Sequence, residues 1–344
     1  MKDLIKELSS LHAISGFEYR INEKIRDIFS EYCDEVKIDV LGNVIAVKHS
    51  KVKDAKKILI EAHMDEIGLM VKNIDEKGFI TFENVGGVDE RILPASEVII
   101  HGKKDIKGII GAKPPHIMSS GEGKKTVKIT DMAIDTGFDA ETVKNTVSIG
   151  DCITFAQEPK ELADGQMTGK SLDDRASIAV LIEVMKNLPD SIEAEVYAVA
   201  SVQEEVGGFG AMTAAFSVYP DMAVAIDVCH GITPDNSYCA YEVGKGTVIT
   251  CGPNIHPAIF SRLKKTAEDE KIDFQIDVDG GNTGTDAWEM QVIREGIPTG
   301  LLSIPLKYMH TFVEALDISD VKATAELSIR FINGLKAEEE WLCF

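Results

Sequence analysis

Histidine and carboxylate side chains follow four apolar segments of the chain, and these side chains can bind divalent cations and activate water. The segments read KKILIEA, EVYAVASV, DMAVAIDV and GLLSIPL, and their composition predicts buried strands. Ligands of open α/β sheets lie beyond the carboxyl ends of the strands, so side chains at these positions can converge on one site. The pattern therefore predicts a divalent-metal hydrolase. The side chains are His63, Asp65, Glu204, Glu205, Asp227 and His310.

A further acidic pair, Asp173 and Asp174, occurs in GKSLDDRAS, at the start of a segment that predicts a helix. One interpretation adds these carboxylates to the predicted metal site. In the alternative, one of them caps the helix and Arg175 is its ion-pair partner.

The spacing of His63 and Asp65 suits a metal site on an extended segment. Residues i and i+2 of such a segment point the same way, so both side chains can face one cavity. Asp65 could bind metal directly, or it could accept the proton of the other imidazole nitrogen and fix the tautomer that binds metal. A lone His-x-Asp also occurs by chance, so its position after an apolar strand carries the prediction.

Glu204 and Glu205 are adjacent carboxylates that repel each other unless cations or protons offset their charge. On an extended backbone the two side chains diverge, so one could bind metal while the other faces the attacking water. The alternative is a solvated turn before Gly207 and Gly208. Asp227 lies in so apolar a segment that its carboxylate requires a partner to offset desolvation.

The patterns along the chain predict two units. Residues 1–67 and 161–344 alternate between helical and strand patterns, including two amphipathic helices within residues 1–35, which predicts an α/β fold with a mixed sheet flanked by helices. Residues 68–160 consist of short β-branched runs separated by turns, which predicts a small inserted all-β unit. The sequence SSGEGKK at 119–125 predicts a mobile loop.

Composition narrows the class of protein. The chain has 344 residues, 44% of them hydrophobic, and 57 acidic against 36 basic residues give a net charge of −21. Such a charge repels phosphate backbones and anionic lipids, so we expect neither nucleic acid nor a membrane as partner. The six cysteines form no metal-binding pattern, and no signal peptide or long apolar run occurs. We therefore expect a cytoplasmic protein.

Six motifs in order resemble those of the tetrahedral and glutamyl aminopeptidases, the co-catalytic dinuclear metallo-aminopeptidases numbered family forty-two, some of which have been labelled endoglucanases. The resemblance spans nearly the whole chain, and six ordered motifs are far more specific than any one. The motifs are AHMDEIGLMV, GKSLDDRAS, VQEEVGGFGA, AIDV, GTDAWEMQ and IPLKYMHTFVE.

The resemblance implies a two-metal site and a role for each residue. Asp173 would bridge two divalent ions, and Glu204 would be the general base that acts on a shared water. Asp65 would orient His63. The remaining ligands would be His63 and Asp227 for one ion, and Glu205 and His310 for the other. Zinc is the favoured metal, and cobalt and manganese suit the same ligands.

The resemblance also implies an assembly. The inserted unit would be a dimerisation domain, and dimers would assemble into a hollow tetrahedral dodecamer that admits peptides. The chain departs from its relatives at Trp288, Lys307, Thr311 and Phe312, which we expect near the substrate pocket, so the preferred N-terminal residue is not implied.

Three alternatives remain open at this stage. A deacylase or amidase acting on acylated amino acids could use the same two-ion site. A glycosidase needs two carboxyl groups across a cleft rich in aromatic residues, whereas this chain has only two tryptophans. A non-enzymatic acidic assembly protein would have a closed structural metal site, against which the unassigned Glu204 argues.

Overall fold

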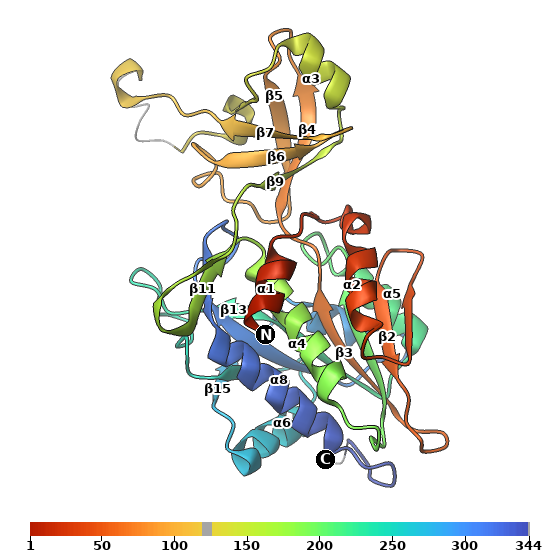
Figure 1. Cartoon of the computed structure of the whole chain (residues 1–344). Coiled ribbons are helices and arrows are strands. Elements are labelled where there is room, and N and C mark those ends of the chain that lie inside the picture. The colour runs from red at the N-terminus through yellow and green to blue at the C-terminus, as the bar shows by residue number, and fades with distance from the viewer. Residues whose placement is uncertain (119–125, 343–344) are drawn as a thin grey trace.

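The computed structural model describes residues 1–118 and 126–342. The loop predicted at 119–125 lies outside these residues. In Figure 1 a β-barrel stands above a large sheet whose front face is covered by helices. The mixed α/β fold with a small inserted β unit is confirmed.

The large sheet has eight strands within the described residues, and its four central strands are mutually parallel. These four strands are buried along almost their whole length, as expected where both faces of a sheet are covered. The order across the sheet is β1 (Glu35–Ile38), β2 (Val44–Lys48), β12 (Glu195–Ser201), β3 (Lys57–His63), β13 (Met222–His230), β16 (Thr299–Leu306), β14 (Thr247–Cys251) and β15 (Phe274–Val278).

Helices cover both faces of this sheet and form a separate core on each. Helix α4 (Leu172–Asn187) is buried on almost all sides, because it packs against one face of the sheet and against helices α1 (Lys2–Ser9) and α8 (Ile318–Asn333). One core involves α1 (Lys2–Ser9), α2 (Asn22–Phe29), α4 (Leu172–Asn187), α6 (Pro257–Glu270) and α8 (Ile318–Asn333). The other involves α5 (Phe209–Val218) and α7 (Asp286–Met290).

The barrel leaves the large sheet after β3 and has its own apolar core. Strand β7 (Asp105–Ile110) alternates exposed and buried residues, as expected for a strand with one face packed on a core. The barrel order is β4 (Gly68–Ile74), β5 (Ile80–Val85), β8 (Ile134–Asp135), β7 (Asp105–Ile110), β6 (Glu97–His101) and β9 (Cys152–Phe155). Beside the barrel and the large sheet lie α3 (Ala140–Thr146) and a small sheet of β10 (Lys160–Glu161), β11 (Gln166–Gly169) and β17 (Glu314–Asp317).

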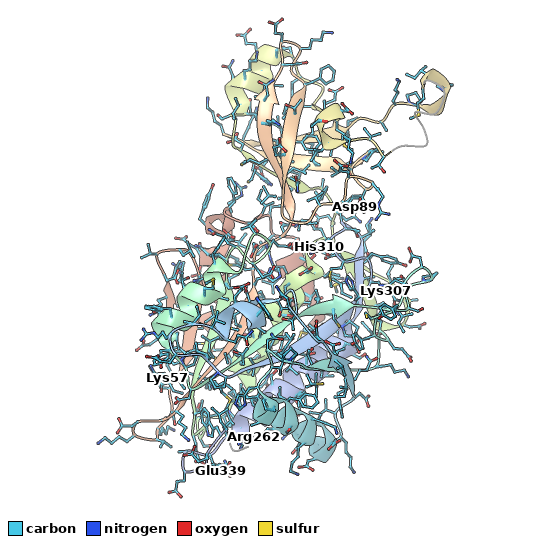
Figure 2. All side chains as sticks on the ribbon, turned by 180° about the vertical axis from the view of Figure 1, so that it is seen from behind. Lys57, Asp89, Arg262, Lys307, His310 and Glu339 are labelled. Carbon is cyan, nitrogen blue, oxygen red and sulfur yellow. The ribbon has the colours of Figure 1, made fainter. Side chains whose placement is uncertain are left out.

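The register of the central strands determines how far along the sheet each predicted site residue lies. His63 of β3 pairs with Ser201, the last residue of β12. Ala225 of β13 pairs with Glu61, so Asp227 lies level with His63 two residues further along. The carboxyl ends of these strands face the barrel, whereas Lys57, Arg262 and Glu339 lie at the far end of the molecule (Figure 2).

Several predicted boundaries differ from the structure. Strand β13 continues to His230, so the prediction that Asp227 ends its strand is wrong. Helix α7 ends at Met290, where a turn follows. The inserted segment contains helix α3, so it is not entirely β-structure. The boundaries at 68 and 160 stay a prediction.

Among the described residues, no helix combines the length and apolar character that crossing a bilayer requires.

Candidate metal and catalytic site

His63 and Asp65 lie at and just beyond the end of β3, and both are buried. Nδ1 of His63 lies 3.5 Å from Oδ1 of Asp65. Asp65 also accepts the backbone N–H groups of Glu204 at 3.1 Å and Glu205 at 3.2 Å, together with the hydroxyl of Ser15. Asp65 therefore holds the loop after β12 in place as well as facing His63.

Glu204 and Glu205 lie in a turn before Gly208, as the alternative interpretation had it, and not on an extended backbone. Gly207 donates to the carbonyl of Glu204 at 2.9 Å, which closes the turn. The two side chains nevertheless diverge, as predicted. Oε2 of Glu204 lies 3.9 Å from Nε2 of His63, whereas Oε2 of Glu205 lies 3.5 Å from Nε2 of His310.

Asp173 lies between the two histidines. Its Oδ1 is 3.1 Å from Nε2 of His63, and its Oδ2 is 3.5 Å from Nε2 of His310. Asp173 and Asp174 have non-helical backbone angles at the start of α4 and are joined by a cis peptide bond. Arg175 donates to the carbonyls of Leu8 and Ala13, so it is not the ion-pair partner that the cap interpretation required.

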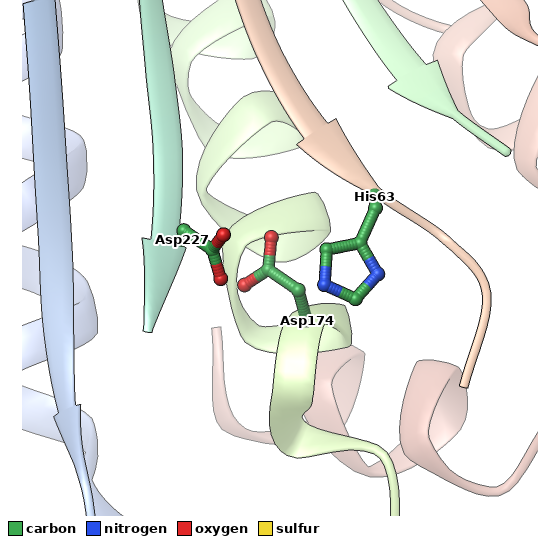
Figure 3. Close-up of side chains that lie close together, drawn as sticks. All are labelled: His63, Asp174 and Asp227. Atoms are coloured by element: carbon green, nitrogen blue, oxygen red, sulfur yellow. The ribbon is translucent and has the colours of Figure 1, made fainter. Parts of the chain in front are cut away.

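Asp174 and Asp227 form a second group with His63 (Figure 3). One potential ligand atom from each of these three buried residues lies within 4.8 Å of the others. Both carboxylate oxygens of Asp174 are buried without a hydrogen-bond partner among the described residues. The sequence placed Asp174 in the acidic pair but gave it no role of its own.

His310 reaches the site from a loop four residues beyond the end of β16, with a left-handed φ of 60°. Its backbone N–H donates to Oε1 of Glu314 at 3.1 Å, and Oε2 of Glu314 accepts the N–H of Asp173 at 3.2 Å. Its Nδ1 lies 3.2 Å from the carbonyl oxygen of Gly87, which follows barrel strand β5. Figure 2 shows His310 where the sheet meets the barrel.

The proton affinities of these groups reflect burial and crowding. Burial alone would lower the pKa of His63, but its contacts with the carboxylates of Asp173 and Asp65 raise it well above its usual value. Burial would raise the pKa of Asp173, yet its contacts with His310 and His63 hold it far below the usual range.

Burial raises the pKa of Glu204 to about 10 and that of Asp227 to about 6, with neighbouring carboxylates contributing. Burial likewise raises the pKa of Glu205 and that of Asp174 well above the usual values. A cluster of this kind is unfavourable as bare anions and needs protons or cations.

A buried polar group behind the site was not predicted. Oγ of Ser201 lies 2.6 Å from Oε1 of Glu61 and 3.1 Å from Oδ2 of Asp286. Burial raises the pKa of Glu61 to about 8, and that of Asp286 is raised well above its usual value by burial and by Glu61. The signals were present in the sequence, as a carboxylate inside KKILIEA and an aspartate in GTDAWEMQ.

A cavity of about 520 Å³ opens at the site and is lined by His63, Asp173, Glu204, Asp227 and His310. The structure thus brings together all five predicted metal ligands and Glu204.

The four departures noted in the sequence, at Trp288, Lys307, Thr311 and Phe312, are not among the residues that line this cavity, although Thr311 directly follows His310, which does. Their proximity to the substrate stays a prediction. Phe312 packs against Phe155 of the barrel, with 5.2 Å between ring centroids.

Comparison with known proteins gives consistent results. The sequence model of the M42 glutamyl aminopeptidases matches residues 42–327. The lysyl aminopeptidase of Pyrococcus furiosus is 37% identical, and the alignment covers 97% of each chain. An aminopeptidase structure from Desulfurococcus kamchatkensis has a TM-score of 0.92 at 35% identity and covers 99% of this chain and 96% of that one.

Two further structures bear on the alternatives. A structure titled as Pyrococcus horikoshii TET1 peptidase, which can assemble into a tetrahedron or a large octahedral shell, has a TM-score of 0.86 at 32% identity, with 97% and 99% of the two chains covered. A Thermotoga maritima structure titled endoglucanase has a TM-score of 0.78 at 32% identity, with 95% and 96% covered.

Proposed function

The chain belongs to the M42 glutamyl aminopeptidase family, and from this membership we propose how its own residues hydrolyse the first peptide bond of a peptide. Members of this family are metal-dependent hydrolases that act on peptides, and this chain is one of them. The roles of single residues, the number of ions and the metal are our proposal.

The position of Asp173 is the observation that carries the proposal. Its two oxygens face two different imidazoles, one at 3.1 Å and the other at 3.5 Å. A carboxylate placed in this way can serve two cations at once, one beside each histidine. Hydrolases with two metal ions use the ions together to activate water and to stabilise the leaving group, and Asp173 would hold such a pair here.

The side chains present fit divalent cations on chemical grounds. Imidazole nitrogens and carboxylate oxygens are ligands for zinc, cobalt and manganese. The oxygens of Asp174 are buried without a hydrogen-bond partner among the described residues, which is costly for a carboxylate unless a cation lies beside it. Burial, together with neighbouring carboxylates such as Asp173, raises the pKa of Glu205, and a cation beside it would favour its charged form.

We assign His63 and Asp227 to one ion, Glu205 and His310 to the other, and Asp173 to both. Asp174 lies close enough to His63 and Asp227 to support the first of these groups. Zinc is the metal we favour, because it suits these nitrogen and oxygen ligands.

Two such ions, when bound, would lower the pKa of a shared water and polarise the scissile carbonyl. Glu204 is the general base in this proposal, because its carboxylate reaches the site without belonging to either ligand group. It accepts the proton of the attacking water and passes it to the departing amine nitrogen. Asp65 holds the Glu204–Glu205 turn through two backbone N–H groups and faces Nδ1 of His63.

We also propose that the chain forms homodimers through the barrel unit, residues 68–160, and that dimers assemble into a tetrahedral dodecamer. The assembly of the P. horikoshii TET1 peptidase into a tetrahedron or a large octahedral shell supports the tetrahedral part of this proposal. Apolar side chains are exposed on the barrel segment, which suits an interface: Phe79, Ile109, Phe138 and Ile149. Mass photometry would test the assembly, and a single-chain mass at micromolar concentration would contradict it.

A cytoplasmic location is also proposed. Five cysteines in the described part of the chain are unpaired thiols, which suits a reducing compartment.

The function is tested by chelating the purified protein and assaying a panel of aminoacyl p-nitroanilides after zinc, cobalt or manganese is added back. We expect chelation to abolish hydrolysis and one or more of the metals to restore it. An N-acetylated dipeptide serves as the comparison for deacylase activity. Cleavage of the acetyl group with no hydrolysis of free-amine substrates would contradict the proposed reaction.

A further inference from the structure

The cavity at the site continues away from the predicted ligands and across the face of the large sheet. Beyond Asp227 of β13 it is lined by Ser303 and Leu301 of β16, Thr250 of β14, and Asp277 of β15. Asp279, two residues after Asp277, lines the same end of the cavity as Asp277. The cavity therefore has the catalytic groups at one end and two carboxylates at the other.

The strand register gives the length of this cavity. Asp227 pairs with Ser303, and Thr250 pairs with Asp277. Strands β13, β16, β14 and β15 are consecutive neighbours. Ser303 pairs with Val248, two residues before Thr250, so Asp277 is offset along the strands from Asp227. With neighbouring strands about 4.8 Å apart and about 3.3 Å per residue along a strand, roughly 16 Å separate the backbones of Asp227 and Asp277.

The middle of the cavity is neutral. Leu301 offers an apolar wall, and Ser303 and Thr250 offer hydroxyl groups. The hydroxyl of Thr250 is buried and has no hydrogen-bond partner among the described residues, although this side chain borders the cavity. A buried hydroxyl in this state is available to a ligand.

The far end of the cavity is acidic. Asp277 accepts the hydroxyl of Tyr241 through Oδ1, and Asp279 accepts the N–H of Gly281 at 2.8 Å through Oδ1. Among the described residues the second oxygen of each carboxylate has no hydrogen-bond partner. The described side chains that line the cavity include no lysine or arginine. Two carboxylates without a cation attract a positive group and repel a negative one.

Gly252 is the residue that allows Asp279 to lie here. A Cβ on Gly252 would come 2.0 Å from the carbonyl oxygen of Asp279, so any side chain would push the backbone of Asp279 away from β14. The N–H of Asp279 donates to the carbonyl of Cys251 at 3.0 Å, which continues the strand pairing to this point.

We propose that this cavity takes the side chain of the first residue of the substrate and selects a long cationic side chain, lysine or arginine. The inference rests on the proposed function, because it requires the scissile bond to lie at the metal and catalytic site. A lysine side chain extends roughly 6 Å from its Cα, so its methylene groups would pass the neutral wall and its ammonium group would approach Asp277 and Asp279. A glutamate side chain is shorter and carries the repelled charge.

The first test compares substrates on the wild-type enzyme. Lysyl, norleucyl and glutamyl p-nitroanilides differ in charge, and norleucine keeps the methylene chain of lysine without the ammonium group. We expect kcat/KM for the lysyl substrate to exceed that for the norleucyl substrate by about 10- to 100-fold, the value of a charged hydrogen bond. A norleucyl or glutamyl preference would overturn the proposal.

The second test removes the charges singly. Asp277→Asn and Asp279→Asn should each reduce the lysyl-to-norleucyl ratio of kcat/KM by about tenfold or more. Asp273→Asn is the matched control, because Asp273 is an exposed carboxylate just before the same strand and does not line the cavity. Unchanged ratios in both test variants, or an equal fall in the control, would overturn the assignment.

A third test asks which substrate position the cavity serves. The dipeptides Lys-Ala and Ala-Lys carry the same charge at different positions, and we expect the preference for lysine only in Lys-Ala. A preference confined to Ala-Lys would show that the cavity holds the second residue.

Binding measured without turnover separates this inference from the proposed function. Calorimetry with free L-lysine and L-norleucine should show tighter binding of lysine by the wild type and a smaller difference in Asp277→Asn. If no aminoacyl substrate is hydrolysed under any metal, the proposed function fails, and calorimetry still decides whether the cavity selects a cation. Equal binding of the two amino acids would overturn the selectivity.

Discussion

The two sides of the proposed metal site are built from different kinds of structural element. On one side, His63, Asp174 and Asp227 are buried and come from two adjacent strands and the start of α4. On the other side, the side chain of His310 is 38% exposed and reaches the site from a loop. We call these the His63 side and the His310 side.

In the described part of the chain, the segment that carries the barrel contacts the His310 side of the site. The carbonyl oxygen of Gly87, in the segment after β5, lies 3.2 Å from Nδ1 of His310. Gly86 packs closely on Glu205, because a Cβ on Gly86 would lie 3.3 Å from Cβ of Glu205. The His63 side is built from the paired strands β3 and β13 and from the start of α4. We infer that the inserted segment shapes the active site in addition to any role in assembly, and that the His310 side holds its ion less tightly.

The largest expected effect comes from Asp173, which faces both sides. Asp173→Ala should release both ions and reduce hydrolysis to the uncatalysed background, because each histidine loses the carboxylate opposite it. Metal analysis of the purified variant together with an aminopeptidase assay would check this.

Asp174→Asn is the matched comparison for that variant. The structure groups Asp174 with His63 and Asp227, so we expect metal loss on the His63 side. Equal metal content in the wild type and in Asp173→Ala would contradict the shared role.

A smaller effect is expected for Glu204, which belongs to neither ligand group. Glu204→Gln should keep both ions and lower kcat by about 10²- to 10⁴-fold, the usual contribution of a general base. Metal content and steady-state kinetics measure the two parts. Near-normal turnover in this variant would falsify the role of Glu204.

The dependence of the His310 side on the barrel is tested by Gly87→Ala. The added Cβ would lie 2.6 Å from Nδ1 of His310, so the imidazole must move. We expect the affinity of the weaker-bound ion to fall by about 10- to 100-fold, the typical cost of disturbing a partner of a metal ligand.

Gly111→Ala is the control for this variant, because Gly111 lies in the same inserted segment and nothing lies within 4 Å of its added Cβ. Metal titration followed by kinetics would distinguish the two. Equal affinities in the two variants would show that the barrel does not tune the site.

The smallest expected effect is a pH dependence of the thermal stability of the metal-free protein. The contact with Asp173 raises the pKa of His310 to about 9 from 6.5. A raised pKa adds stability that is complete below pH 6.5 and is lost as the pH rises through 9. The melting temperature of the chelated protein should therefore fall by a few degrees over this window, a modest change because the side chain is partly exposed to solvent.

The metal-loaded protein should show little of this change, because a ligating imidazole is already unprotonated. Calorimetric scans at pH 6.5 and pH 9, with and without chelator, would measure it. A melting temperature of the chelated protein that rises with pH would contradict the prediction.

Much of the site was predictable because strand periodicity and residue chemistry are local. KKILIEAHMD fixed a buried strand ending in His63, and parallel strands bring their carboxyl ends to one edge. The sequence could not decide between a turn and an extended backbone at Glu204, because the geometry there depends on Asp65, which is distant in sequence and accepts both backbone N–H groups. Glu314 was quoted within a motif but received no role, because its partners come from a different segment.

By itself, the sequence determined the order of the elements, the residue types of the site and the family, because apolar periodicity and side-chain chemistry depend only on the local sequence. Only the tertiary structure decided which groups face one another. The position of Asp173 between two histidines, the contact of Gly87 with His310, and the acidic end of the cavity at Asp277 all depend on strand order and register. Such contacts join residues far apart in sequence, and the pattern within any one segment does not contain them.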